Sequence, residues 1–360
     1  MSWLIYGANG YTGELVARLA VRRGERPVLA GRSADRIVPL ATELGLEHRA
    51  FGLDEPLALR RGLDGISVVA HCAGPFLATA RQMALACCDT GTHYLDITGE
   101  IDVFEQLHEL GPRAAEAGIV LLPGAGFDVV PTDCLALKVA TALPGAGTLD
   151  LAFLAGTGPS RGTTRTAVAM LREGGRARIN GVITPVPARW RSVRADFPSG
   201  PRTVSAVPWG DVSTAYYSTG VPNITTYTPT PPGGGMLTAL LRFPPAAAAA
   251  ELLAGQVRGP GSVRRARGHA EVWARATHGS RTATATLTTP NPYDLTADSV
   301  VRAAVRLAAQ SDMSEDAAEA GPPAPVAGVV PAGMHTPATA FGADYVTELD
   351  GVVAGPVSVS

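Results

Sequence analysis

Over the first 135 residues, short apolar runs alternate with longer amphipathic segments. The runs Trp3–Tyr6, Ser67–Cys72, His93–Ile97 and Ile119–Leu122 have the length and composition of buried strands. The segments between the runs place apolar residues at helical spacing, as directly after Gly13. This alternation predicts an α/β Rossmann domain with a mostly parallel, doubly wound sheet.

From about residue 148 the pattern changes to alternating apolar and polar positions, most clearly in Thr282–Leu287. Such runs recur often enough to predict a second α+β domain with a mainly antiparallel sheet. Helices are expected at Thr163–Glu173, Met236–Leu253 and Thr296–Ala309. The acidic, Ala- and Pro-rich segment Gln310–Pro325 is expected to be a mobile loop.

The two patterns divide the chain into a Rossmann domain at 1–135 and an α+β domain at 136–330. The second domain is expected to bind the substrate or to form a dimer interface. Thr336 and Pro337 are typical of a helix start, which predicts a last helix over 336–350. Residues 351–360 are expected to form a flexible tail.

Composition narrows the class of protein. Of the 360 residues, 46% are hydrophobic and 17% charged, which is typical of a globular chain. No window approaches the ~18 apolar residues of a membrane span, and Met1 lies too close to the first strand for a signal peptide. The net charge of −2 gives no reason to expect nucleic acid. The four cysteines lack paired spacing, so we expect reduced thiols, no zinc site and a cytoplasmic location.

Three glycines follow the first strand, at Gly7, Gly10 and Gly13. Gly7 permits a sharp turn, Gly10 allows the backbone to approach a pyrophosphate, and Gly13 allows the helix to close on the strand. The phosphates would bind at the N-terminus of that helix, where N–H groups and the helix dipole favour anions. The spacing differs from the commoner GxGxxG, so the motif needs support from its surroundings.

That support comes from Arg32, which ends the second predicted strand where an NAD site usually has an acid. An arginine here accommodates the 2′-phosphate of NADP, which predicts NADP(H) as the cofactor. A solvated loop cation is the alternative for Arg32. Asp54 follows the third strand, where it either lies near the adenine or is the N-cap of the next helix.

Other strand ends supply candidates at the edge of the sheet where ligands bind. Ala73–Phe76 is expected to form the floor beside the ribose and nicotinamide, and the loop Pro123–Asp133 has the glycines and acids of an active-site loop. The cofactor residues predicted from the sequence are Gly7, Asn9, Gly10, Tyr11, Thr12, Gly13, Arg32, Ser33, Asp54, Ala73, Gly74, Pro75, Phe76, Gly126, Phe127 and Asp128.

Five blocks of sequence give the chain a family resemblance: Gly7–Gly13, Ala30–Arg32, Ala73–Phe76, Tyr94–Glu100 and Gly126–Asp133. In these blocks it resembles the saccharopine dehydrogenase-like oxidoreductases, and within them the trans-acting enoyl reductases of polyketide and complex-lipid assembly. The resemblance continues through Gly158–Thr163 and Thr336–Gly342 and so covers nearly the whole chain. Arg161 and the segment 312–325 depart from the family pattern, which leaves the substrate open.

The resemblance implies NADPH-dependent reduction of an enoyl thioester or a related unsaturated intermediate, small or carrier-bound. It also implies that the last helix packs back on the first domain. Partners that it allows are a polyketide synthase and a second copy of the chain in a homodimer. Two alternatives stay open: an imine (C=N) reductase of the saccharopine-forming type, and a non-catalytic NADPH-binding partner protein.

The candidate catalytic residues are Tyr94, Asp96, Asp128 and Tyr217, and those for the substrate are Ser160, Arg161 and Thr163. Four of them have a structural alternative: the two aspartates can tie loops together, Ser160 can cap a helix, and Tyr217 can line an apolar pocket. The Tyr-x-x-x-Lys pair of short-chain dehydrogenases is excluded, because the only lysine is Lys138 and position 134 is Cys134.

Overall fold

The computed structural model describes residues 2–156, 158–164, 168, 174–229, 250, 252–253, 257, 259–318 and 328–360. The chain forms two compact units, each built from several segments. Unit 1 comprises 1–98, 102–127 and 293–341, and unit 2 comprises 99–101, 128–292 and 342–360. The expected boundary at 135 therefore differs from the observed one at Phe127, and residues 293–330 belong to unit 1.

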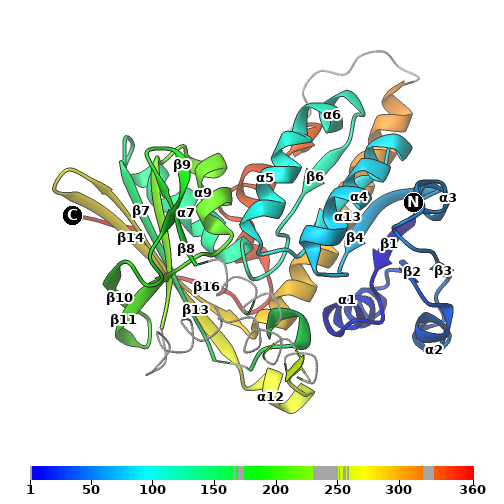
Figure 1. The fold of residues 1–360 in the computed structure, drawn as a ribbon, viewed down its shortest axis with the longest axis horizontal. Helices are drawn as coiled ribbons and strands as arrows, with labels where there is room; N and C mark the ends of the chain where they lie inside the picture. Colours follow the sequence, from blue (N-terminus) through cyan, green and yellow to red (C-terminus); the bar gives the residue numbers. More distant parts are fainter. Residues whose placement is uncertain are drawn as a thin grey trace. The chain divides into compact units, whose positions relative to one another are not determined.

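Unit 1 is built on a seven-stranded, entirely parallel sheet (Figure 1). Its strands are β1 (Ser2–Tyr6), β2 (Val28–Gly31), β3 (His48–Ala50), β4 (Ile66–His71), β5 (His93–Asp96), β6 (Val120–Leu122) and β15 (Gly333–Met334). Their order is β15-β6-β5-β4-β1-β2-β3. Apart from β15 this is the doubly wound order 3-2-1-4-5-6, which confirms the predicted fold class.

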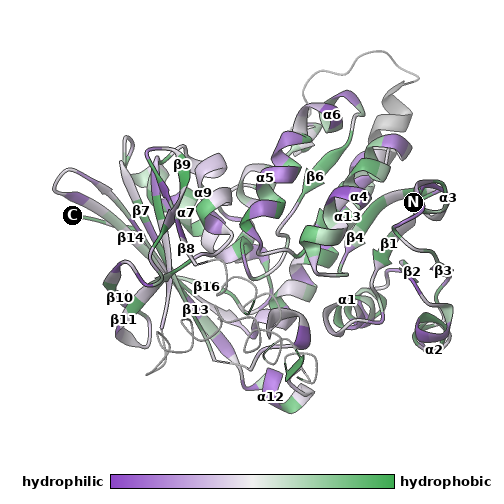
Figure 2. Cartoon of the chain, in the orientation of Figure 1, coloured by the Kyte–Doolittle hydropathy of each residue, from purple (hydrophilic) through white to green (hydrophobic). Residues whose placement is uncertain are grey.

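Alternate side chains of each strand enter two different cores. Trp3 and Ile5 pack beneath α1 (Tyr11–Arg22), α2 (Ala34–Leu44) and α13 (Pro292–Ala318). Leu4 and Tyr6 enter the opposite core. The helices of that second face are α3 (Pro56–Gly62), α4 (Phe76–Thr90), α5 (Ile101–Glu109) and α6 (Gly111–Glu116). Both faces are covered, which explains why β4 and β6 are drawn largely in the hydrophobic colour in Figure 2.

The C-terminal part of the chain completes unit 1. Gly333 and Met334 pair in parallel with Val120 and Leu121, and α13 supplies Val300 and Leu307 to the core beneath α1. Helix α13 is longer than the predicted Thr296–Ala309. The rest of the expected mobile loop, from residue 319 to 325, lies outside the described residues.

Unit 2 is built on a mixed, mostly antiparallel sheet of order β10-β11-β12-β7-β13-β14-β16. Its longer strands are β7 (Thr148–Ala155), β10 (Ser192–Phe197), β11 (Gly200–Val207), β12 (Asn223–Thr228), β13 (His269–His278) and β14 (Arg281–Pro290). The hairpin of β8 (Gly175–Ile179) and β9 (Val182–Val186) joins it through β12. Only the β7–β12 pair among these strands is parallel, so the prediction of a mainly antiparallel second domain is confirmed.

Helices α7 (Val130–Ala142) and α9 (Asp211–Thr219) pack together in unit 2, with α7 also against β7, β13 and β14. The threonine-rich strand β14 shows why the alternation of its residues was informative. Ala283, Ala285 and Leu287 are buried, whereas the threonines between them are partly exposed. A short helix, α12 (Ser262–Ala266), precedes β13.

Two predictions for the C-terminus are wrong. The expected helix over 336–350 is only α14 (Pro337–Phe341), followed by a 3-10 turn at Tyr345–Glu348, because Gly342 adopts a left-handed φ of 87°. The expected flexible tail instead forms β16 (Val353–Ala354) and β17 (Ser358–Val359), which both pair with β14. Residues 342–360 therefore belong to unit 2 rather than to the Rossmann domain.

Two predicted helices fall largely outside the described residues, namely Thr163–Glu173 and Met236–Leu253. Within the part of the chain that is described, no helix combines the length and apolarity needed to cross a membrane.

Candidate functional site

The glycine loop between β1 and α1 has little room for side chains. Gly7 has a φ of +84°, and a Cβ there would lie 2.8 Å from Ala73 Cβ, at the end of β4. A Cβ on Gly13 would lie 2.3 Å from the carbonyl oxygen of Gly7. Each glycine is thus required by a close approach of backbone, as the spacing predicted. Gly10 is the N-cap of α1, and its N–H donates to Gly7 O at 2.9 Å.

The loop is fixed against the second strand. The N–H groups of Gly7 and Ala8 both donate to Ala30 O, at 2.7 and 3.2 Å. The Asn9 side chain is exposed and reaches Gly31, where a Cβ would lie 3.3 Å from Asn9 Oδ1. Thr12 lies in the first turn of α1, whose N–H groups have no partner within the helix. The loop and first turn therefore form a backbone cradle that suits the phosphates of a dinucleotide.

Arg32 is exposed at the end of β2 and makes no ion pair within the described residues. Its charge and that of Asp54 act in opposite directions on the pKa of the Tyr6 phenol, which burial raises to about 12. Both charged groups therefore lie near the end of β1. Asp54 is not a helix cap, because the N-cap of α3 is Glu55. Ser33 is the N-cap residue of α2. A free guanidinium and the lack of an acid on β2 fit a 2′-phosphate at this edge.

The end of β4 supplies the wall next to the glycine loop. Gly74 and Pro75 are exposed, and Ala73 contacts the position where a Gly7 side chain would lie. Phe76 is different, because its ring packs 5.5 Å from the His71 ring inside the core. Of the predicted floor Ala73–Phe76, the Phe76 ring therefore lies in the core, and Ala73, Gly74 and Pro75 are the residues with some exposure. Burial lowers the pKa of His71 to about 3, so this residue is a neutral core histidine.

Tyr94 and Asp96 are fully buried in unit 1, and their predicted catalytic role is not supported. The Tyr94 hydroxyl donates to Asp96 Oδ2 at 2.5 Å, and the N–H groups of Thr98 and Gly124 donate to Asp96 Oδ1 at 2.9 Å each. Burial and the neighbouring carboxylate raise the pKa of Tyr94 well above its ordinary value. Asp96 thus ties together the loops after β5 and β6, the structural alternative expected from the sequence.

Gly126 and Phe127 are held against the start of α13. The Phe127 N–H donates to Thr296 Oγ1 at 3.0 Å, and a Cβ on Gly126 would lie 3.0 Å from Thr296 Cγ2. Tyr11 is held in a similar way, since its ring packs edge to face on Tyr293 at 4.9 Å. Tyr293 has no signal in the sequence, because the pattern does not show which helix covers the glycine loop.

Asp128 is the candidate acid that lacks partners. Its carboxyl group is half-buried and makes no hydrogen bond or ion pair within the described part of the chain. Burial raises its pKa to about 7. The surroundings are defined: a Cβ on Gly99 would lie 3.2 Å from Asp128 Oδ2, and the indole N–H of Trp209 donates to Asp128 O at 2.9 Å. Trp209 was not predicted from the sequence.

Two more carboxyl groups lie nearby, between α7 and α9. Thr132 of α7 donates to Asp211 of α9, and Ser218 of α9 donates to Asp133 of α7. Asp211 is fully buried, and its second oxygen has no hydrogen-bond partner among the described residues. Burial raises its pKa well above the ordinary value, and the charges of Asp133 and Asp128 add to this effect. The charges of Asp133 and Asp128 thus disfavour ionisation of Asp211.

The predicted substrate residues form a capped helix start. Ser160 Oγ accepts a hydrogen bond from the Thr163 N–H at 3.3 Å and lies 3.1 Å from Thr163 Oγ1. These contacts give Ser160 the capping role considered for it, and Arg161 is exposed. Tyr217 is half-buried and packs on Tyr216 at 5.6 Å, beside the guanidinium of Arg178.

The strand order and the glycine cradle of unit 1 define a dinucleotide-binding domain of the Rossmann class. Residues 3–122 match the family described as saccharopine dehydrogenase NADP binding domain. The predicted cofactor class and the family resemblance are thereby confirmed. The match covers unit 1 only in part and does not include unit 2.

Trans-acting enoyl reductases of Mycobacterium tuberculosis and Mycobacterium bovis are 31% identical to this chain over 138 residues. These residues are 36% of this chain and 33% of each relative, so the chain matches about a third of their length.

Two solved structures share the fold over the whole chain. Saccharopine dehydrogenase (L-Glu forming) of Saccharomyces cerevisiae has a TM-score of 0.62 and 14% identity, with 100% of this chain and 99% of that chain covered. Homospermidine synthase of Legionella pneumophila, solved with NAD, has a TM-score of 0.62 and 12% identity, with 100% and 91% covered. At these identities the similarity establishes the two-domain fold.

Proposed function

We propose that this chain is an NADPH-dependent reductase that delivers hydride to a carbon–carbon double bond conjugated to a thioester carbonyl. The family of unit 1 supports the cofactor, and the names of the mycobacterial relatives support the reaction. The structural observation that carries the proposal is Asp128. A half-buried carboxyl group with a pKa of about 7 and no hydrogen-bond partner among the described residues can hold and release a proton near neutral pH.

The residues of unit 1 have defined tasks in this reaction. The glycine cradle would hold the pyrophosphate, and Arg32 would hold the 2′-phosphate. When bound, NADPH would supply the hydride for the β carbon of the substrate, and the electron pair of the double bond would move toward the α carbon and the carbonyl oxygen.

Asp128 completes the reduction by donating its proton to the α carbon, and it regains a proton from water. The products are NADP⁺ and the saturated thioester, so atoms and electrons balance. Trp209 holds the backbone of Asp128 through its indole N–H, which fixes the position from which the carboxyl group acts. The donor must be protonated, and a pKa of about 7 keeps a large fraction in that form at neutral pH.

The relatives are named as trans-acting, which implies a substrate presented by another protein. We extend this to the present chain and propose a carrier-bound unsaturated thioester as substrate, with a polyketide synthase as the partner. The exposed Arg161, beside the capped helix start at Ser160, is available for such a substrate.

The test is NADPH oxidation with an enoyl thioester, with the saturated thioester as a blank, in wild type and Asp128→Asn. We expect turnover only with the unsaturated substrate, and a kcat lower by about 100- to 10,000-fold in the variant. Asp196→Asn is the matched control, because Asp196 is an exposed aspartate of the same unit, and it should retain full kcat.

Two outcomes contradict the proposal. Turnover that needs both an amine and a 2-oxo acid would indicate an imine reductase. An unchanged kcat in Asp128→Asn would leave the hydride transfer but exclude Asp128 as the proton donor.

A further inference from the structure

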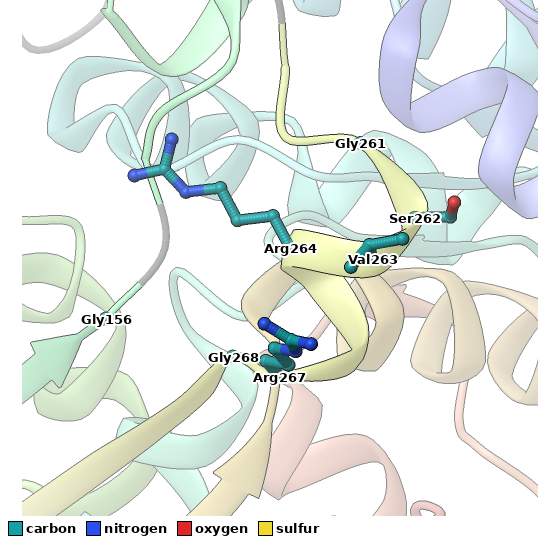
Figure 3. Close-up of a pocket in the computed structure, with 7 residues that line it drawn as sticks. All are labelled: Gly156, Gly261, Ser262, Val263, Arg264, Arg267 and Gly268. Carbon is teal, nitrogen blue, oxygen red and sulfur yellow. The ribbon is translucent and has the colours of Figure 1, made fainter.

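A cavity of about 560 Å³ lies in unit 2, beside the short helix α12 (Figure 3). Ser262, Val263 and Arg264 line it from the helix, and Arg267 lines it just beyond the helix end. The other lining residues are the glycines at 156, 261 and 268, so much of the remaining wall is backbone. The volume is in the range of pockets that bind small organic molecules and exceeds what a single ion needs.

The cavity carries two positive charges that have no partner in the described part of the chain. Arg264 and Arg267 are exposed, and neither makes an ion pair or hydrogen bond there. Other arginines of the chain do pair with carboxylates, for example Arg113 with Asp89 and Arg275 with Asp150. Among the described residues that line the cavity, none is acidic.

Arg264 links the cavity to the segment predicted to bind substrate. In Figure 3 its side chain extends from α12 toward the chain near Gly156. A Cβ on Gly158 would lie 3.5 Å from the guanidinium carbon of Arg264, which is ordinary van der Waals contact. Gly158 is the first residue of the motif Gly158–Thr163, so the cavity and this motif are neighbours within unit 2.

The combination of groups favours an organic phosphate. A guanidinium presents two parallel N–H donors that match phosphate oxygens, and two such groups suit a doubly charged or extended phosphate. Glycines at three positions let a ligand approach the backbone closely. Val263, which is 68% exposed, offers an apolar contact for the carbon chain attached to the phosphate.

We propose that this cavity binds the phosphate group that carries the acyl thioester, either in coenzyme A or in the phosphopantetheine arm of a carrier protein. This inference rests on the proposed function, because it identifies the handle by which the same substrate is held. The reacting double bond lies at the other end of the pantetheine chain, so the two arginines contribute to binding and not to the chemical step.

The experiment compares two enoyl thioesters with the same reacting end, crotonyl-coenzyme A and crotonyl-N-acetylcysteamine, which has no phosphate. In the double variant Arg264→Ala/Arg267→Ala we expect KM for the coenzyme A ester to rise about tenfold or more with kcat unchanged. KM for the phosphate-free ester should not change. Arg281→Ala is the control, an exposed arginine of β14 outside the cavity, and should behave as wild type.

A third substrate, crotonyl-phosphopantetheine on a carrier protein, separates the two sources of phosphate. A larger rise in KM for the carrier-bound ester than for the coenzyme A ester assigns the site to a carrier, and the reverse assigns it to free coenzyme A. Equal KM values in wild type and double variant for both phosphate-bearing esters overturn the proposal.

Calorimetric binding of free coenzyme A and of free phosphopantetheine keeps this test separate from the proposed function, since neither needs turnover. If no thioester is reduced but either ligand binds to wild type and not to the double variant, the phosphate site stands and the reductase proposal falls. If thioesters are reduced, but neither ligand binds and KM does not change in the double variant, the reductase proposal stands and the phosphate site falls. Circular dichroism of the double variant confirms that it is folded.

Discussion

The two units differ in the number of hydrogen bonds that a buried or half-buried carboxyl group accepts. In unit 1, Asp96 is fully buried and accepts three hydrogen bonds from Tyr94, Thr98 and Gly124. In unit 2, Asp128 accepts none from the described residues and has a pKa of about 7. Asp96 is the last residue of the buried strand β5, and Asp128 lies in the loop after the buried strand β6. The number of donors around the carboxyl group therefore distinguishes the structural acid Asp96 from Asp128, the proposed proton donor.

The largest expected difference between Asp128 and an ordinary aspartate lies in the pH dependence of stability. We compare the free energy of unfolding of wild type and Asp128→Asn. The pKa of Asp128 rises from 3.8 to about 7 on folding. Because the folded pKa is the higher one, the unfolded chain loses this proton first, and wild-type stability falls as pH rises from about 4 to 7. Over this window the wild type should lose up to about 4 kcal/mol relative to the variant.

Urea unfolding at a series of pH values measures this difference. It should be constant below and above the window, where both states of the chain carry the same charge at this position. Parallel curves for the two proteins would show that Asp128 titrates normally and would remove the contrast with Asp96.

The next largest effect is the loss of stability in Asp96→Ala. Removal of this carboxylate leaves buried donors at Tyr94, Thr98 and Gly124 without an acceptor, so the free energy of unfolding should fall by about 3 kcal/mol or more. Chemical denaturation at pH 7 measures it, with Asp64→Ala, an exposed aspartate of the same unit, as the control. A loss below about 1 kcal/mol would mean that Asp96 is not the tie between the two loops.

A smaller effect is expected at Arg32, which makes no ion pair with any described residue. Arg32→Ala should weaken NADPH binding by about tenfold or more and leave NADH binding unchanged, because only NADPH has the 2′-phosphate. Calorimetry with both nucleotides measures this, and Arg36→Ala, an exposed arginine of α2, is the control. Equal losses for the two nucleotides would show that Arg32 does not read the phosphate.

The smallest effect is expected when the hydrogen bond from the Trp209 indole N–H to the Asp128 carbonyl is removed. Trp209→Phe removes one hydrogen bond to the Asp128 carbonyl but keeps an aromatic ring beside Phe153, 4.9 Å away in the wild type. We expect kcat to fall about fivefold, equivalent to about 1 kcal/mol, with the Kd of NADPH unchanged. Steady-state kinetics and calorimetry together measure it. A changed Kd for NADPH with the same kcat would show that Trp209 acts on cofactor binding and not on the chemical step.

Much of unit 1 follows from local patterns in the sequence. The apolar run Trp3–Tyr6 followed by spaced glycines fits few structures other than a strand, a tight turn and a helix. Position 13 must be glycine, because any Cβ there would clash with Gly7 O. The presence of Arg32, and not an acid, directly after the second strand is likewise visible in the sequence. In unit 2 the alternation of threonine and apolar residues in β14 predicts a strand with one buried face, as observed.

Other features depend on partners that are distant in the sequence. The pattern of α13 predicts a helix but not that it covers the core beneath α1 in unit 1. The strands β16 and β17 have two residues each and acquire their structure only by pairing with β14. The difference between Asp96 and Asp128 also depends on donors from other loops. Arg264 and Arg267 belong to an arginine-rich stretch of the sequence. The sequence does not show that these two arginines line a common cavity.

The seventh strand of unit 1 has a consequence for how the protein is made. Because β15 and α13 come from residues 292–334, a ribosome must synthesise almost the whole chain before the first domain can close its sheet and cover its core. Residues 128–292 of unit 2 emerge while that core is still open on one side. A fragment that ends near residue 127 would therefore expose the apolar surface that Val300 and Leu307 normally cover, and it would tend to aggregate.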